Sequence, residues 1–199
     1  NIKLNEDVVA DYEKYIKSHP YQNGRGFWAL EPFFQKDMPV TEDYAQQQSK
    51  VSNKAIYIIG RTCGEDQDNS NKEGSYLLTK EEMSNIKNIT SSFEKVVIVL
   101  NVSNVIDMSW MENFNGRIKS VLYSWCGGME GGNSVADILC GKVTPSGKLP
   151  DTIPIELDDH PAHKNFGGKN KNLYKEDIYV GYRYFETFAP EKVKFEFGY

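Results

Sequence analysis

The chain has 199 residues, of which 39% are hydrophobic and 13% are aromatic, so it can bury a substantial core and is not expected to be disordered. Its net charge of −5 and isoelectric point near 5.3 give no basic footprint for nucleic acid or for an anionic membrane. No apolar run approaches the roughly 20 residues that a membrane-spanning helix needs.

The first half of the chain is predicted to contain three helices and one strand. Asn5 and Thr41 can each cap a helix, and Thr79 forms a capping box with Glu82 ahead of a third. Proline and glycine interrupt residues 18–40, which are expected to form a loop. The helices are expected over 5–17, 41–51 and 79–93, and the strand over 55–59.

The second half alternates between strand and helix patterns. Residues 95–101 are almost continuously apolar, which is typical of a strand buried on both faces. A glycine turn leads into a helix that Gly141 ends. Further strands are expected over 119–125 and 178–185, and a short helix over 108–114.

This order of elements predicts an α/β fold. We expect a three-layer α/β/α sandwich with a mostly parallel sheet and one or more antiparallel strands late in the chain. Residues 1–40 are expected to form a loop-rich segment packed on the domain, and residues 41–199 the domain itself.

The cysteines point to no disulfide framework and no zinc site. Cys63, Cys126 and Cys140 are odd in number and contain no CxxC pair. The first residues lack the charged start and apolar stretch of a signal peptide, so we expect a cytoplasmic protein with reduced thiols. No metal or other cofactor is predicted.

Two apparent binding motifs do not match their templates. The acidic segment 66–77 is spaced like a calcium loop, but Asn71 and Leu77 stand where that loop needs glycine and glutamate. The run "GGMEGGN" (127–133) lacks a phosphate-loop ending, and Glu130 would repel phosphate. We interpret this run as a tight turn between a strand and a helix.

Glu65 follows the predicted strand 55–59, at the kind of edge where parallel sheets bind ligands. From position alone, a solvated acidic loop explains Glu65 better than a catalytic site does. The segment "GFWALEPFF", with Phe27 and Trp28, fits a sugar-stacking surface and a buried patch equally well.

Four segments in order carry a more specific signal. They are "IGRTCGEDQDN … GSYLLTKEE", "KVVIVLNVSNVIDMSW", "VLYSWCGGMEGGNSVADILCGKVTPSGKLPDTIP" and "YKEDIYVGYRYFET … FEFGY". Together they resemble the α/β-sandwich domain of glycoside hydrolase family 3, the domain usually described as C-terminal. The resemblance runs from about residue 40 to 199, and Gly127–Pro150 is its most specific part.

The resemblance implies part of a retaining, exo-acting β-glycosidase that releases terminal non-reducing β-D-glucosyl residues. Glu65 matches the family's general acid/base, and Asp66 is the alternative. Burial and the nucleophile's charge would raise the pKa of Glu65, whereas Arg61 would oppose that rise. Arg61, Trp28 and Phe27 are candidate contacts to the sugar.

The family's nucleophile motif and its barrel domain are absent from this chain. We therefore expect the chain to need the barrel domain of the same parent protein and to be inactive alone, with a β-glucoside or oligosaccharide as substrate. Two other function classes stay open. One is a noncatalytic carbohydrate-binding or structural domain, and the other, less favoured, is a flavodoxin-like nucleotide binder.

Overall fold

A computed structural model describes residues 2–24, 31–62, 68–114 and 116–199. The chain divides into two compact units. The first comprises Asn1–Asn104 and Glu112–Thr144, and the second comprises Val105–Met111 and Pro145–Tyr199.

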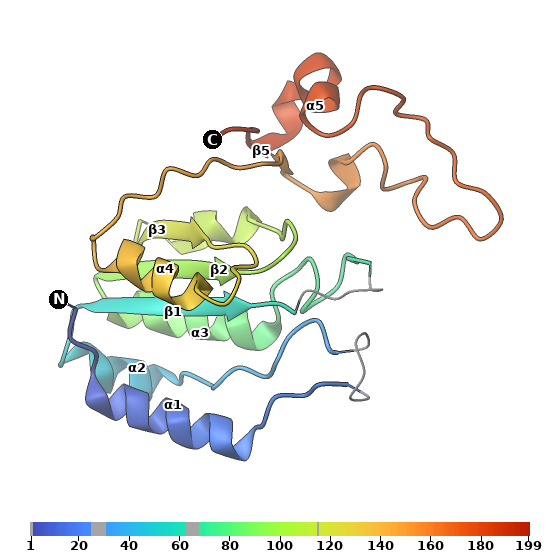
Figure 1. Ribbon diagram of the computed structural model, residues 1–199. Coiled ribbons are helices and arrows are strands. Elements are labelled where there is room, and N and C mark those ends of the chain that lie inside the picture. Colours follow the sequence, from blue (N-terminus) through green and yellow to red (C-terminus); the bar gives the residue numbers. More distant parts are fainter. Residues whose placement is uncertain (1, 25–30, 63–67, 115) are drawn as a thin grey trace. The chain divides into compact units, whose positions relative to one another are not determined.

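The first unit is built on a parallel sheet of three strands in the order β1-β2-β3 (Figure 1). The strands are β1 (Lys54–Gly60), β2 (Lys95–Asn101) and β3 (Ile118–Tyr123). Tyr57 of β1 pairs with Ile98 of β2, which pairs in turn with Val121 of β3. Central β2 is buried along most of its length, as its continuous apolar run predicts.

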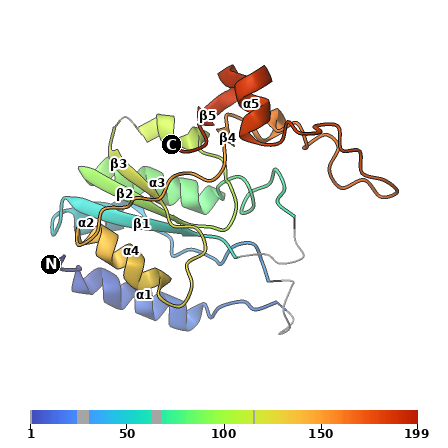
Figure 2. The same cartoon turned by 45° about the horizontal axis from the view of Figure 1, so that its top comes forward.

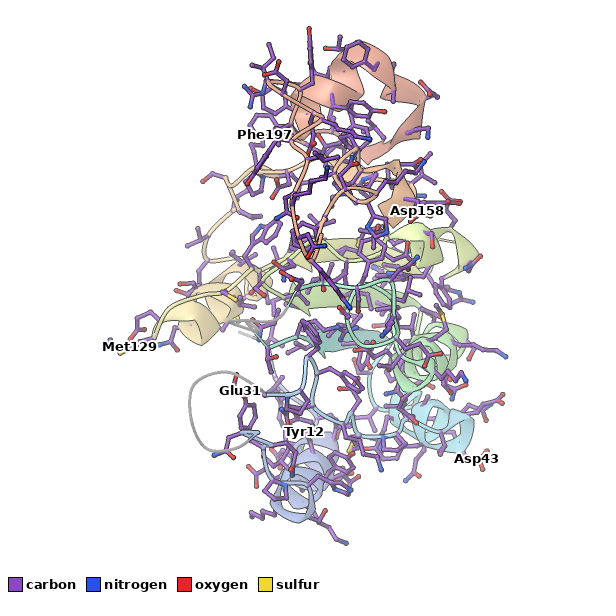
Figure 3. The ribbon with its side chains drawn as sticks, turned by 90° about the vertical axis from the view of Figure 1, so that its right-hand side faces the viewer. Tyr12, Glu31, Asp43, Met129, Asp158 and Phe197 are labelled. Atoms are coloured by element: carbon purple, nitrogen blue, oxygen red, sulfur yellow. The ribbon has the colours of Figure 1, made fainter. Side chains whose placement is uncertain are left out.

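Helices cover both faces of this sheet. α3 lies on one face and α4 on the other (Figures 2 and 3). α2 packs against α3. The side chain of Asn5, the N-cap of α1, donates a hydrogen bond to Gln48 Oε1 of α2. The predicted three-layer arrangement is therefore confirmed. The helices of this unit are α1 (Glu6–Ser18), α2 (Glu42–Ser49), α3 (Lys80–Ser92) and α4 (Gly131–Leu139).

The helix starts follow the caps in the sequence. Asn5 accepts from the N–H of Asp7, and Thr41 accepts from that of Tyr44. Thr79 and Glu82 form the predicted capping box at the start of α3. The α3 side of the core contains Ile86 and Ile89 from the helix and Ile59, Ile98 and Leu100 from the sheet, all buried.

The second unit has a small antiparallel pair, β4 (Ile153–Pro154) with β5 (Val193–Phe195). Its helix α5 (Tyr182–Phe188) buries Phe185, and His160 contacts that ring edge-on at 5.6 Å between ring centres. The antiparallel strands expected late in the chain are thus present. Short 3₁₀ helices are η1 (Ser109–Phe114), η2 (Leu157–Asp159) and η3 (Pro190–Lys192).

The predicted strand over 178–185 is wrong. Residues 178–180 form no strand, and α5 starts directly after Gly181, which has φ 59° and ψ −131°. Tyr182, Phe185 and Phe188 recur every third residue, which is a helical spacing that the high aromatic content concealed. Tyr184 contacts Phe188 within this helix, whereas Tyr182 stacks on Phe197 after β5.

Candidate active site

The carboxyl ends of the three parallel strands meet at one edge of the sheet (Figure 1). The Arg61 N–H donates to the Asn101 carbonyl oxygen at 3.0 Å, so the exit from β1 is tied to the end of β2. The Ser124 N–H donates to the Leu100 carbonyl oxygen at 2.9 Å, which ties the exit from β3 to β2 as well. This is the edge at which open α/β sheets bind ligands.

Of the predicted site residues, only Arg61 lies within the described part of the chain. Glu65, Asp66, Trp28 and Phe27 lie outside the described residues, in the segments 25–30 and 63–67. Arg61 is described, and so are the residues that flank both segments. The contacts described at this edge are therefore those of the residues on either side of segment 63–67.

Arg61 lies directly after β1 and uses all of its side-chain donors within this unit. Its guanidinium forms a bidentate ion pair with Glu82, in which Nη2 donates to Oε2 at 2.8 Å. The remaining N–H groups donate to the carbonyl oxygens of Gly60, Leu77 and Ser75. An arginine has five such donors, and all are used here. The predicted contact between Arg61 and a sugar stays a prediction, and this conformation does not favour it.

The segment that follows the Glu65 loop is organised around Ser75. The Ser75 hydroxyl donates to Asn69 Oδ1 at 2.7 Å and accepts from the Ser70 N–H at 3.0 Å. Gly74 adopts a positive φ of 77°, and a Cβ added there would overlap the ring of Phe34. Only glycine fits this close approach without strain.

Thr62 connects the same edge to the aromatic segment. Its N–H donates to the Phe33 carbonyl oxygen at 2.7 Å, and its hydroxyl donates to the Pro32 carbonyl oxygen at 2.7 Å. The Arg61 guanidinium lies 5.9 Å from the centre of the Phe34 ring. Residues 32–34 therefore lie beside the start of the loop that contains Glu65.

A second polar cluster holds the chain just beyond this contact. The Tyr57 hydroxyl donates to Asp37 Oδ2 at 2.5 Å, and Asn85 of α3 donates to the Met38 carbonyl oxygen at 3.0 Å. Asn85 Oδ1 also accepts from the Val40 N–H at 2.7 Å. Burial is the main cause that raises the pKa of Asp37, and the hydrogen bond from Tyr57 opposes it.

The glycine-rich run forms the turn between β3 and α4 that the sequence predicted. A Cβ on Gly127 would lie 2.7 Å from the Gly131 Cα, so this close approach requires glycine. Met129 is fully exposed and projects away from the turn (Figure 3). Glu130 accepts from the Asn133 side chain at 2.6 Å. Its carboxylate stands at the start of α4, where a phosphate would have to bind.

Sequence reasoning missed two features of this edge. Glu82 was recognised only as part of a capping box, although its spacing to Ile86 and Ile89 places it on the buried face of α3. That spacing could have predicted that the Glu82 carboxylate is buried and needs a partner. Trp125, just after β3, has a positive φ of 54°, and its ring centre lies 4.2 Å from that of Tyr123. A positive φ leaves no signal in the residue type.

The described residues contain neither a metal-binding cluster nor a membrane-spanning helix. Within these residues no cluster of three or more histidine, cysteine, aspartate or glutamate side chains is arranged to hold a metal ion. Nor does any described helix have the length and apolar character needed to cross a bilayer.

Comparison with known families identifies the chain's relatives. The family model described as "Glycosyl hydrolase family 3 C-terminal domain" matches residues 5–182. A "Beta-glucosidase" of Ruminococcus albus is 49% identical over 197 residues, covering 99% of this chain and 20% of that protein. "Beta-glucosidase A" of Butyrivibrio fibrisolvens is 35% identical and aligns with 100% of this chain and 26% of its own length.

Solved structures give the same result for the fold. A β-glucosidase from Paenibacillus barengoltzii has a TM-score of 0.96 and 54% identity over 100% of this chain and 22% of that chain. Beta-glucosidase 3B from Thermotoga neapolitana, solved in complex with glucose, has a TM-score of 0.85 and 30% identity over 100% of this chain and 28% of that chain. This chain thus spans about a quarter of the length of the relatives that it matches.

Proposed function

The chain belongs to the glycosyl hydrolase family 3 C-terminal domain family, and we propose that it is the acid/base-supplying domain of a retaining, exo-acting β-glucosidase. The parent enzyme would hydrolyse terminal non-reducing β-D-glucosyl residues from a glucoside or oligosaccharide. One observation carries the proposal. Along almost its whole length the chain matches β-glucosidases that are much longer, and in its sequence the Gly64-Glu65 pair comes shortly after strand β1, which ends at the edge where open α/β sheets bind ligands.

Retaining hydrolysis needs two carboxyl groups about 5–5.5 Å apart. One attacks the anomeric carbon, and the bond to the leaving oxygen breaks. The other starts protonated, gives its proton to that oxygen, and then accepts a proton from the water that releases glucose. We assign the second role to Glu65 and place the nucleophile on a barrel domain of the same parent protein, outside this chain.

The described residues suit this assignment electrostatically. A free guanidinium beside Glu65 would favour its ionised form, which cannot act as an acid. Arg61 is instead neutralised by Glu82 in a buried pair. Arg61 therefore does not stand at this edge of the sheet as an unpaired positive charge.

The proposal is tested by replacing Glu65 with alanine in the full-length parent enzyme, with Asp66→Ala as the matched control. The substrates are an alkyl β-glucoside, whose leaving group needs a proton, and a dinitrophenyl β-glucoside, whose leaving group does not. General acid catalysis contributes about 10²–10⁴-fold. Glu65→Ala should therefore lose about that factor in kcat/KM on the alkyl glucoside and much less on the aryl one.

Each alternative predicts a different pattern. If Asp66→Ala shows the selective loss and Glu65→Ala does not, Asp66 is the acid/base. If neither variant shows it, the domain is noncatalytic, and its carboxylates are structural or contact sugar without donating a proton.

A further inference from the structure

We propose that the outer edge of strand β1, at Ile56 and Ile58, is the docking site for a further strand, supplied by a part of the parent protein outside these 199 residues. The docked strand would extend the sheet beyond β1. The inference concerns how the domain is completed, and it does not depend on the role of Glu65. It rests on the backbone groups, the side chains and the residue types of β1.

The backbone groups of two β1 residues point away from the sheet. β1 is an edge strand in the order β1-β2-β3. The register pairs Gly60 with Asn101, and the Arg61 N–H donates to the Asn101 carbonyl oxygen. Residues whose backbone groups face β2 alternate along β1 with residues whose groups face outward. Ile56 and Ile58 therefore direct their N–H and C=O groups outward.

Other groups already occupy this outer edge on either side of the two isoleucines. The Lys54 N–H donates to the Ser52 hydroxyl at 3.1 Å at the start of β1. The Thr62 N–H donates to the Phe33 carbonyl oxygen at 2.7 Å just beyond its end. Within the described residues no hydrogen bond reaches the outward backbone groups of the two isoleucines. The edge therefore has a gap that a short strand can fill.

The side chains of the same two residues are exposed. Tyr57 lies on the α3 face, where Asn85 donates to its hydroxyl, so Ile56 and Ile58 lie on the opposite face, on which α4 packs (Figure 2). Ile58 pairs with Val99 of β2, yet Ile58 is 54% exposed and Val99 is 1% exposed. Ile56 is 40% exposed. The cover on this face thus reaches β2 and stops short of β1.

The residue types of β1 do not protect a free edge. Proteins guard such edges with charges, proline or bulges, because an uncovered apolar edge pairs with other chains. Residues 55–60 read "AIYIIG", with no charge and no proline, and their register with β2 has no shift. The other edge strand, β3, exposes Lys119 and Ser120. The edge of β1 is therefore expected to be covered in the intact protein.

The occupant is inferred from the length of the relatives. Those that align with all or nearly all of this chain use only 20–28% of their own length to do so. A strand on the same polypeptide is held at a high effective concentration beside the edge. A second copy of this chain would bring a second net charge of −5, which opposes the pairing of two identical edges. We therefore assign the edge to the parent polypeptide, in a segment with apolar side chains on the Ile56 face.

Hydrogen exchange of the full-length parent enzyme tests the docking without any substitution. Mass spectrometry with fragmentation that resolves single amides follows the exchange. The amides of Tyr57 and Ile59 face β2 and serve as the internal reference. We expect the amides of Ile56 and Ile58 to exchange within about tenfold of this reference, because a docked strand accepts from them. Exchange of both at the rate of an open edge would overturn the proposal.

A photochemical cross-link identifies the occupant. The parent enzyme is produced with p-benzoylphenylalanine at position 58 and irradiated, and the product is separated on a denaturing gel and digested. We expect a cross-link within one polypeptide, to a segment outside residues 1–199. The same label at Val51, which is exposed but precedes the sheet, should not give that cross-link. A cross-linked dimer would assign the edge to a second copy, and cross-links confined to residues 1–199 would leave no outside strand at the edge. Either result would contradict the proposal.

Discussion

The guanidinium of Arg61 and the carboxylate of Glu82 form a bidentate ion pair in which both side chains are almost fully buried. The two residues come from different elements, one from the end of β1 and the other from the first turn of α3. Their contact fixes the start of α3 to the edge of the sheet from which the Glu65 loop departs. The attachment of α3 to this edge of the sheet therefore depends on this ion pair.

Removing the two charges is expected to have strongly non-additive effects on the free energy of unfolding. Removing one partner of a buried pair costs about 3–5 kcal/mol, because the other charge remains buried and unpaired. Arg61→Met and Glu82→Leu should each destabilise by about that amount, and the double variant should lose less than the sum of the two. Denaturant unfolding of the three variants and of the wild type checks this. Additive losses would show that the two charges do not interact.

Gly74→Ala is expected to destabilise the segment after the Glu65 loop. Gly74 has a φ of 77°, and an added Cβ would overlap the Phe34 ring. We expect a loss of at least about 1 kcal/mol, since alanine at a positive φ is strained even in open space. Gly60→Ala is the control, because a Cβ at Gly60 meets nothing within 4 Å. Equal unfolding midpoints for the two variants would contradict this account.

Asp37 should make stability depend on pH. Burial raises the pKa of Asp37 above that of the unfolded chain, which is about 3.9. Its contribution to stability is therefore fully present below about pH 3.9 and is lost as the pH rises through the raised pKa. Asp37→Asn removes this titration and keeps an oxygen that can accept from Tyr57.

The test is the difference in unfolding free energy between the wild type and Asp37→Asn, measured as a function of pH. It should shift against the wild type as the pH rises through this window, and then become constant. A difference that is independent of pH, or that shifts in favour of the wild type, would refute the assignment of this titration to Asp37.

The chain by itself should not turn over a glycoside. The proposed mechanism needs a nucleophile about 5–5.5 Å from the acid/base, and we place that nucleophile on a separate domain. Incubation of the purified 199-residue chain with nitrophenyl β-glucoside should release no more nitrophenol than a heat-denatured sample does. Nitrophenol release above that background would contradict this prediction, since it would show that the chain turns over a glycoside without a separate domain.

The sequence predicted the elements of the first unit well, because capping and periodicity agree there. The capping box of Thr79 and Glu82 predicts the start of α3, and the apolar run of β2 predicts a central strand. Helix α5 was missed because aromatic residues favour strands in general. Here Tyr182, Phe185 and Phe188 recur at helical spacing, in a helix that starts after Gly181.

The site was only partly predictable for a different reason. A Gly-Glu pair after a strand is visible in the sequence, whereas the partner of Arg61 lies 21 positions away and depends on how α3 packs on the sheet. The capping role of Glu82 can be read from its spacing to Thr79. Its second role, as the ion-pair partner of Arg61, needs tertiary structure.

Azide rescue of the Glu65→Ala parent enzyme tests the central claim most directly. Azide needs no general base, so it can attack the glycosyl-enzyme intermediate when the acid/base carboxyl is missing. The account predicts that azide accelerates turnover of dinitrophenyl β-glucoside by Glu65→Ala and yields β-glucosyl azide, with no such acceleration in the wild type. Turnover that is unchanged by azide, with glucose as the sole product, would contradict the assignment of Glu65 as the acid/base.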